Sequence, residues 1–268
     1  IIMGANIGTS ITGWILCLSY IDGSSGIAQL LSTATISAVV AIIGIIFKMF
    51  VKKANYKNVG DIMLGFAILM VGMQTMSGAV SPLKDNPHFV NLLTKFENPF
   101  MGIIVGIAFT AVLQSASASV GILQALCVTG VVRYSTAIPI IMGQNIGTCV
   151  TAMMGAIGAN KNARRAAMVH LYFNIIGSLL FVLVFYGIGL FHPWDFLGDI
   201  CGEMNIAVIH TSFNVCVTAL LLPLNGLLVK LATLSVPDGK QEEKPVLLDE
   251  RLLATPAVAI QRSQDIAA

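Results

Sequence analysis

The motif Ile1-Ile-Met-Gly-Ala-Asn-Ile-Gly-Thr-Ser-Ile-Thr12 occurs a second time as Ile140-Ile-Met-Gly-Gln-Asn-Ile-Gly-Thr-Cys-Val-Thr151, identical at nine of twelve positions. A match of this length within one chain indicates an internal repeat. Both copies lie in uncharged stretches, yet each carries Gly, Asn and Thr at its centre. We therefore expect two copies of one structural unit, and we interpret the rest of the chain around them.

The composition excludes a soluble globular protein. Hydrophobic residues make up 56% of the 268 residues and charged residues only 10%, against roughly 25% charged in ordinary soluble domains. The mean hydropathy is +0.85, so the chain lacks the polar surface that would cover a core in water, and a lipid bilayer is the expected solvent. The net charge of +2 argues against nucleic acid as a partner, because such binding requires dense basic surface.

Seven uncharged stretches are candidates for membrane helices, which need about 20 apolar residues to span the bilayer. Four of them predict full spans: 27–47, 62–83, 166–190 and 205–229. The other three carry Gly, Asn, Ser, Thr or Gln where a simple span is most apolar, and these predict interrupted helices: 1–20, 99–132 and 135–160. The fold class is therefore an all-α polytopic membrane protein with broken helices.

The positions of the basic residues predict the orientation of the chain. Loops 48–61 and 161–165 concentrate Lys and Arg, which places both in the cytoplasm by the positive-inside rule. Loop 84–98 then lies outside, and the chain must cross an odd number of times before 161–165. Two uncharged stretches occupy this interval, so one of them must turn back, and we assign 99–132 to a re-entrant hairpin.

This orientation inverts the two copies of the repeat. The copy within 1–20 runs outward to a predicted external loop at 21–26, whereas the copy at 140–158 runs inward to the basic loop at 161–165. Inverted repeats with broken helices that meet near the middle of the membrane are typical of secondary transporters.

Candidate binding groups in the interrupted stretches are neutral, since 99–132 and 135–160 contain no Lys, Arg, Asp, Glu or His. Ion-pair capture of a substrate is thereby excluded there, and hydroxyls, amides, backbone groups and helix ends remain. The alternative is that small residues only allow close helix packing, which explains Gly and Ser but not the amides. The candidate substrate- and ion-binding residues are Gln114, Ser115, Ser117, Ser119, Asn145, Gly147, Thr148 and Thr151, with Asn6, Gly8, Thr9 and Thr12 in the first copy.

A second echo pairs His170-x-x-Phe173-Asn174 with His210-x-x-Phe213-Asn214. Its spacing places His and Asn on one helical face. We favour helix packing or indirect support of the site over direct ligation, because polar side chains in membrane bundles usually bond between helices.

These motifs resemble the type II sodium/phosphate cotransporter family, in its bacterial branch. The resemblance rests on Gln114-Ser-Ala-Ser-Ala118, the two Gly-x-Asn-Ile-Gly-Thr motifs and Arg164-Arg-Ala-Ala-Met-Val-His-Leu-Tyr-Phe-Asn174. It implies sodium-dependent symport of inorganic phosphate across the plasma membrane by alternating access, with phosphate and sodium as partners and no enzymatic activity. It also implies no cofactor and no metal other than the transported sodium. Family members carry two Gln-Ser-Ser-Ser tracts, and Ala116 replaces the middle Ser here.

The resemblance also implies the domain organisation. Residues 1–235 form a transmembrane cotransporter domain, in which 1–60 is the remnant of the first repeat and about 99–190 the second. A linker at 236–247 precedes the start of a PhoU-like cytoplasmic domain at 248–268. The first Gln-Ser tract and most of the PhoU-like domain are absent, so we expect the chain to be a fragment.

Two alternative functions stay open beside phosphate symport, and a third is disfavoured. A sodium-coupled transporter of another small anion fits the same neutral site, and so does a membrane-anchored regulator that responds to phosphate. An intramembrane hydrolase is disfavoured, because the chain has no Gly-x-Ser-x-Gly motif to present an activated Ser. The sequence leaves open whether the protein forms a homo-oligomer.

Overall fold

The structure is a computed structural model that describes residues 1–20, 32–237 and 260. Three predicted segments fall almost wholly outside these residues: the external loop 21–26, the linker 236–247 and the PhoU-like segment 248–268. The chain divides into a compact unit, residues 1–235, and a second unit that follows it. Every helix discussed below belongs to the first unit.

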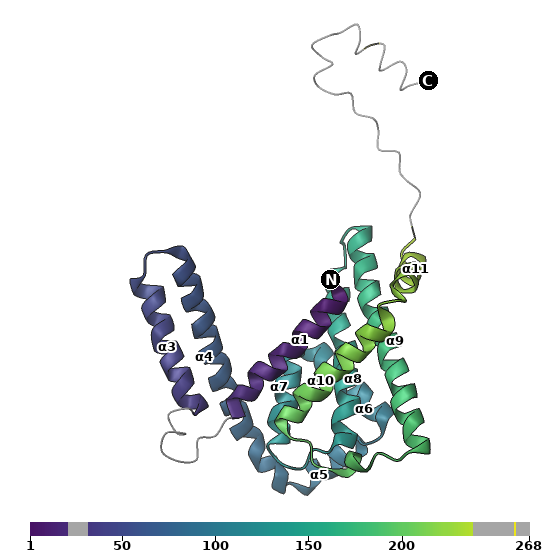
Figure 1. The fold of residues 1–268 in the computed structure, drawn as a ribbon, viewed down its shortest axis with the longest axis horizontal. Coiled ribbons are helices and arrows are strands. Elements are labelled where there is room, and N and C mark those ends of the chain that lie inside the picture. The colour runs from purple at the N-terminus through teal and green to yellow at the C-terminus, as the bar shows by residue number, and fades with distance from the viewer. Residues whose placement is uncertain (21–31, 238–259, 261–268) are drawn as a thin grey trace. The chain divides into compact units, whose positions relative to one another are not determined.

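Within the described residues of this unit the regular structure is helical, apart from one isolated bridge between Arg133 and Ile200 (Figure 1). Six helices are long and apolar enough to cross a membrane, which confirms an all-α polytopic membrane protein. The α-helices are α1 (Ile2–Cys17), α3 (Thr33–Phe50), α4 (Ala54–Val80), α5 (Pro87–Lys95), α6 (Pro99–Leu113), α7 (Ala116–Cys127), α8 (Tyr134–Gly155), α9 (Lys161–Phe191), α10 (Glu203–Leu221) and α11 (Asn225–Ser235). Short 3-10 helices follow at Leu18–Tyr20, Ser81–Asp85 and Asp195–Gly198.

The predicted hairpin at 99–132 is confirmed as two short helices joined at Gln114. Asn98 begins α6 by accepting hydrogen bonds at Oδ1 from the backbone N–H groups of Phe100 and Met101, at 3.0 and 3.4 Å. The 15 residues of α6 and the 12 of α7 rise about 22 and 18 Å, which is less than the roughly 30 Å of a bilayer core. The chain then returns to its starting end, because residues near both ends of the hairpin share one apolar cluster, among them Leu93, Phe96 and Val132.

The prediction of interrupted helices is wrong for the other two stretches. Both α1 and α8 are continuous, and α8 even accommodates Pro139. The polar side chains do not break the helix because they bond back to the carbonyl four residues earlier. Thr9 Oγ1 donates to Ala5 O at 3.0 Å, and Asn145 Nδ2 donates to Ile141 O at 2.9 Å.

The predicted single span at 205–229 is also wrong. The helix α10 ends at Leu221, and α11 begins as a separate helix at Asn225. Pro223 lies between them, and proline has no backbone N–H to continue the helical hydrogen bonds.

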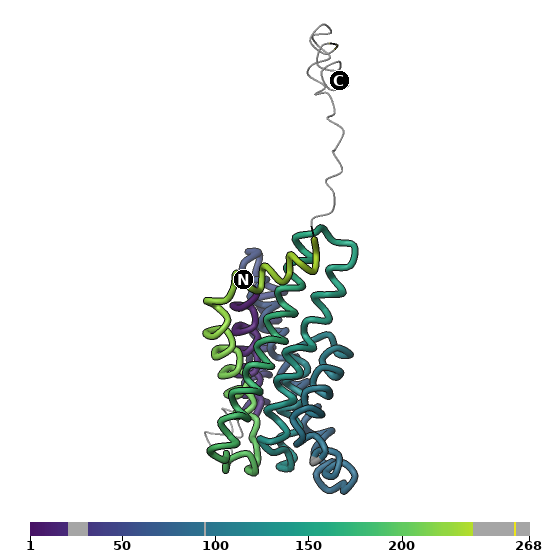
Figure 2. The backbone as a smooth tube through the Cα atoms, turned by 90° about the vertical axis from the view of Figure 1, so that its right-hand side faces the viewer, coloured from purple at the N-terminus to yellow at the C-terminus, as the bar shows by residue number. Residues whose placement is uncertain are grey.

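The two copies of the repeat run in opposite directions, as the charge distribution predicted. Ile2, at the start of α1, lines a hollow together with Ala152 and Gly155 at the end of α8. Figures 1 and 2 show the long helices running between the two opposite ends of this unit. The N-terminus and the C-terminal end of α8 lie at the same end of the unit.

Close packing of glycines fixes the hairpin on α8. A Cβ added to Gly143 would lie 2.1 Å from Ile103 O of α6, and one added to Gly106 would lie 2.2 Å from Ile140 O. The backbones of α6 and α8 are therefore in direct contact, which is how small residues bring membrane helices together. Gly4 and Gly8, which correspond to Gly143 and Gly147 in the first copy, have no atom of the described residues within 4 Å of an added Cβ.

Candidate functional site

The tip of the hairpin is a sharp break at Gln114. This residue has φ 54°, and it alone among the described non-glycine residues has a left-handed conformation. Ser115 follows in an extended conformation and caps α7, since its Oγ accepts from Ala118 N at 3.2 Å. Gln114 is exposed, and its Nε2 lies 3.5 Å from Met154 Sδ of α8. Ser115 and Ser117 are half-buried, so the tip presents one amide and two hydroxyls beside the first turn of α7.

Ser119 lies deeper and holds the hairpin together. Its hydroxyl is fully buried and lies 2.7 Å from the hydroxyl of Thr110 on α6. Its backbone carbonyl accepts from Gln144 Nε2 of α8 at 3.0 Å. Of the four candidates in the tract, Ser119 is therefore a structural anchor in this conformation, whereas Gln114 is exposed and Ser115 and Ser117 are half-buried.

The motif on α8 is mostly buried. Asn145 is 5% exposed and its Oδ1 lies 3.4 Å from His210 Nε2 on α10. Thr148 Oγ1 donates to Asn145 O at 2.6 Å. An added Cβ at Gly147 would lie 2.7 Å from Thr110 Cβ, so this glycine permits the contact with α6. Thr151 is exposed.

The motif on α1 is more open. Asn6 is buried and its Nδ2 donates to Asn174 Oδ1 at 3.2 Å. Gly8 is exposed, and Thr9 and Thr12 are half-buried. The first copy thus presents its small residues on a face that the described residues leave uncovered.

The residues of the second echo join these motifs by hydrogen bonds between helices. Asn174 reaches Asn6, His210 reaches Asn145, and Asn214 Nδ2 donates to Ser10 Oγ at 2.9 Å. These three echo residues are at most 3% exposed, whereas His170 is half-buried. Hydrogen bonding between helices is the role that the sequence analysis favoured for the His and Asn residues of this echo.

Sequence reasoning missed several polar residues of the same region. Ser10 and Cys149 occupy equivalent positions in the two copies, so the repeat itself could have identified them. Gln124 of α7 is fully buried, and its Nε2 lies 3.0 Å from Gly13 O and 3.2 Å from Glu203 O. Nothing in the local sequence marked Gln124 or Gln144. The Oε1 atoms of both are buried without a hydrogen-bond partner among the described residues.

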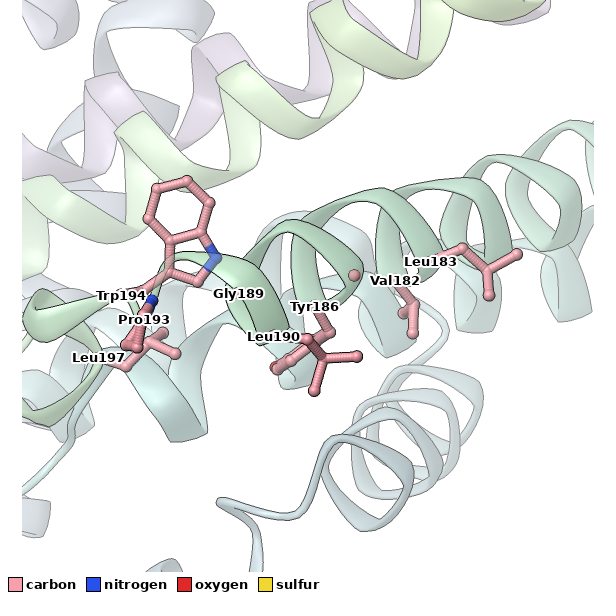
Figure 3. Close-up of a pocket in the computed structure, with 9 residues that line it drawn as sticks. Val182, Leu183, Tyr186, Gly189, Leu190, Pro193, Trp194 and Leu197 are labelled. Atoms are coloured by element: carbon pink, nitrogen blue, oxygen red, sulfur yellow. The ribbon is translucent and has the colours of Figure 1, made fainter.

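A separate cavity of about 600 Å³ lies near the end of α9 and does not belong to this polar region (Figure 3). Apolar side chains and glycines dominate its lining, and Trp194 Nε1 donates to Phe185 O at 2.9 Å rather than facing a ligand. Its lining residues are Val182, Leu183, Tyr186, Gly187, Gly189, Leu190, Pro193, Trp194 and Leu197. We therefore place the candidate site at the hairpin tip and the repeated motifs.

An inverted repeat that carries a helical hairpin on a neutral polar core defines a membrane protein of the secondary-transporter class. The chain belongs to the Na⁺/Pi-cotransporter family, which matches residues 1–78 and 84–201. This is a family of multi-pass membrane transporters and not of enzymes, as the sequence predicted.

Similar proteins occur in bacteria and mammals. The uncharacterized protein YqeW of Bacillus subtilis is 30% identical over 189 residues, which cover 68% of this chain and 58% of YqeW. Sodium-dependent phosphate transport protein 2A of Rattus norvegicus is 35% identical over 147 residues, 49% of this chain and 22% of the relative. YjbB of Salmonella typhimurium, whose name assigns it provisionally to inorganic phosphate export, is 23% identical over 97% of this chain and 46% of its own length.

The chain thus spans about half the length of the bacterial relatives that it matches. No solved structure matches it significantly.

Proposed function

We propose that this chain forms part of a transporter that moves inorganic phosphate together with sodium across the plasma membrane by alternating access. The observation that carries the proposal is the break at Gln114. It ends α6, begins α7 and leaves an amide and two hydroxyls beside the N-terminus of α7. Helix N-termini bind oxyanions through such groups, and the family match and the name of the rat relative favour phosphate as the anion.

The neutral surroundings of the tip require a coupling cation. The stretches 99–132 and 135–160 contain no charged side chain, and a helix end contributes only about half a positive charge. A phosphate dianion moved into such a site without further compensation is strongly destabilised. Sodium therefore supplies the neutralising charge, with no resident cofactor, and phosphate and sodium raise each other's affinity by linkage.

The candidate residues divide into two sets by position. Gln114, Ser115 and Ser117 face phosphate from the hairpin tip. The amide, hydroxyl and backbone oxygens of the repeated motifs supply hard ligands for sodium. This second set is Asn145, Gly147, Thr148 and Thr151 with Asn6, Gly8, Thr9 and Thr12, while Ser119 anchors the tip. Asn174, His210 and Asn214 act indirectly, through the helices that they join, and we assign an indirect role to His170 as well.

The uncovered face of α1 fits a second hairpin of the α6–α7 kind. Gly143 and Gly147 touch α6, whereas their equivalents Gly4 and Gly8 face open space in the described residues. A second hairpin on this face would give each repeat its own binding tip and a site between them.

The test uses the complete protein in proteoliposomes. Phosphate uptake is measured in sodium buffer and in choline buffer of equal ionic strength, with sulfate and small carboxylates as competitors. We expect uptake only with sodium and no competition at tenfold excess. Equal uptake in both buffers would remove sodium coupling from the proposal, and full competition by sulfate would replace phosphate with a broader class of anion.

A further inference from the structure

Two cysteines that are far apart in the sequence meet at the base of the hairpin. Cys127 ends α7, and Cys201 lies two residues before the start of α10. Both are buried, at 4% and 0% exposed, in one apolar cluster. Their side chains lie in hydrogen-bonding contact, and both thiols are free in this structure.

Bonds on both sides of this cysteine pair hold the two segments together. One turn before Cys127, Gln124 Nε2 lies 3.2 Å from Glu203 O. Five residues after Cys127, Val132 O accepts from the backbone N–H of Cys201 at 2.8 Å. The two cysteines are therefore brought together by the backbone of both segments, and their proximity does not depend on the contact between the thiols.

This end of the unit lies outside the cell in the orientation that the basic loops predict. Loops 48–61 and 161–165 are placed in the cytoplasm by their Lys and Arg residues. The helix α9 starts at the second of these loops and runs to Phe191, so Cys201 follows its external end. Disulfides form and persist in oxidising external compartments, whereas cytosolic thiols are kept reduced.

We propose that Cys127 and Cys201 form a disulfide bond, which joins the base of the hairpin to the segment that begins α10. The bond would close the long loop of residues 127–201, and a disulfide restricts the unfolded chain more as the loop that it closes grows longer. It would fix the external end of the hairpin and leave the break at Gln114 unconstrained. The proposal concerns a covalent bond and is independent of the transported substrate.

Formation of the bond is a two-electron oxidation by a disulfide oxidant, R–S–S–R. The thiolate of one cysteine attacks a sulfur of the oxidant, which breaks the oxidant's S–S bond, forms a mixed disulfide and releases one R–S⁻. The thiolate of the other cysteine then attacks the cysteine sulfur of the mixed disulfide and releases the second R–S⁻. The two protons lost by the cysteines end on the released thiolates, giving two R–SH. Because both sulfurs are buried in the folded unit, this exchange takes place before the apolar cluster closes.

Two other roles of the pair are weighed against the disulfide. A structural zinc site takes four ligands, whereas the described residues contain no group of three or more His, Cys, Asp or Glu that could hold a metal ion. Free cysteines also pack as small apolar side chains. Simple packing is therefore the alternative that an experiment must distinguish from the bond.

The direct test is differential alkylation of the complete protein in the membranes of cells that express it. The protein is denatured in acid to preserve its thiols and treated with a light maleimide, then reduced and treated with a heavy maleimide. Peptide mass spectrometry identifies the label on each cysteine, and we expect Cys127 and Cys201 to carry the heavy label. Cys149 is the matched control for burial, because it is 0% exposed and contacts nitrogen and oxygen atoms rather than another sulfur. We expect Cys149 to carry the light label.

Two outcomes would overturn the bond. One is that Cys127 and Cys201 carry the light label together with Cys149, because the pair then consists of two free thiols. The other is that Cys201 keeps the heavy label in Cys127→Ala, because its partner is then a different thiol. Both measurements are masses that require no transport, so their outcome is separate from that of the proposed function.

Thermal inactivation provides a second measurement. Each of Cys127→Ala and Cys201→Ala removes the whole bond, so we expect either variant to lower the midpoint by roughly 10 °C. The double variant should lower it no further, since the two replacements remove one shared interaction. Cys216→Ala is the control, because Cys216 is exposed, and its midpoint should not change. If the two single effects add in the double variant, the cysteines contribute as independent packing groups and the bond is refuted.

Discussion

Replacement of Gly143 by alanine tests the contact that fixes the hairpin on α8. The added Cβ would lie 2.1 Å from Ile103 O, where ordinary contacts begin at 3.4 Å. The obstructing atom is a backbone carbonyl, which cannot rotate away, so α6 and α8 must separate by about 1 Å. Overpacking of this kind costs about 3 kcal/mol at the upper end of its range, and alanine regains about 1 kcal/mol of helix propensity. We therefore expect a net loss of about 2 kcal/mol of stability.

The assay is thermal inactivation of the purified protein in detergent, together with phosphate uptake. Gly155→Ala is the matched control, because Gly155 lies on the same helix with nothing within 4 Å of an added Cβ. We expect Gly143→Ala to lower the midpoint and to reduce uptake, since the hairpin tip is displaced, and Gly155→Ala to do neither. A midpoint for Gly143→Ala equal to that of the unmodified protein would refute the packing argument.

The equivalent replacement Gly4→Ala distinguishes the two repeats. No atom of the described residues lies within 4 Å of a Cβ added at Gly4. Alanine there should therefore leave the stability unchanged or raise it slightly, unless another element covers this position. If a second hairpin covers α1 in the complete protein, as proposed, Gly4→Ala destabilises as Gly143→Ala does. Unchanged thermal stability and uptake in Gly4→Ala would contradict the second hairpin.

Three further predictions concern the polar residues. Gln114→Ala should abolish phosphate uptake without changing expression or the midpoint of thermal inactivation, because the exposed side chain supplies binding groups and makes few packing contacts. Normal uptake by this variant would show that Gln114 has no role in binding. Asn6→Ala and Asn145→Ala should impair uptake to a similar degree, since each is the central amide of one repeat, and loss at one position alone would place the site within a single half. Gln144→Leu should raise the apparent KM for phosphate more than it lowers the thermal midpoint, because it releases the carbonyl of Ser119 near the hairpin tip; an unchanged KM would argue against this positioning.

Local sequence information predicted much of this fold. The apolar stretches gave the spans because a membrane helix satisfies its own backbone hydrogen bonds, and this property depends on the segment alone. The hairpin and the inverted orientation followed from the charges of Lys48, Lys161 and their neighbours. The basic residues of each loop indicate the side of the membrane on which that loop lies, independently of the other loops. The repeat identified Asn6 and Asn145 as equivalent before any contact was known.

Only the tertiary structure decided which polar groups meet. Local sequence did not show that α1 and α8 stay continuous, because a Thr or Asn side chain bonds either to its own helix or to a neighbour. Gln124 and Gln144 gained their roles from helices far away in the chain. The contact of Asn145 with His210 also depends on how α8 and α10, which are far apart in the sequence, pack together. Helix rotation and sliding are settled by long-range packing, which no short stretch of sequence encodes by itself.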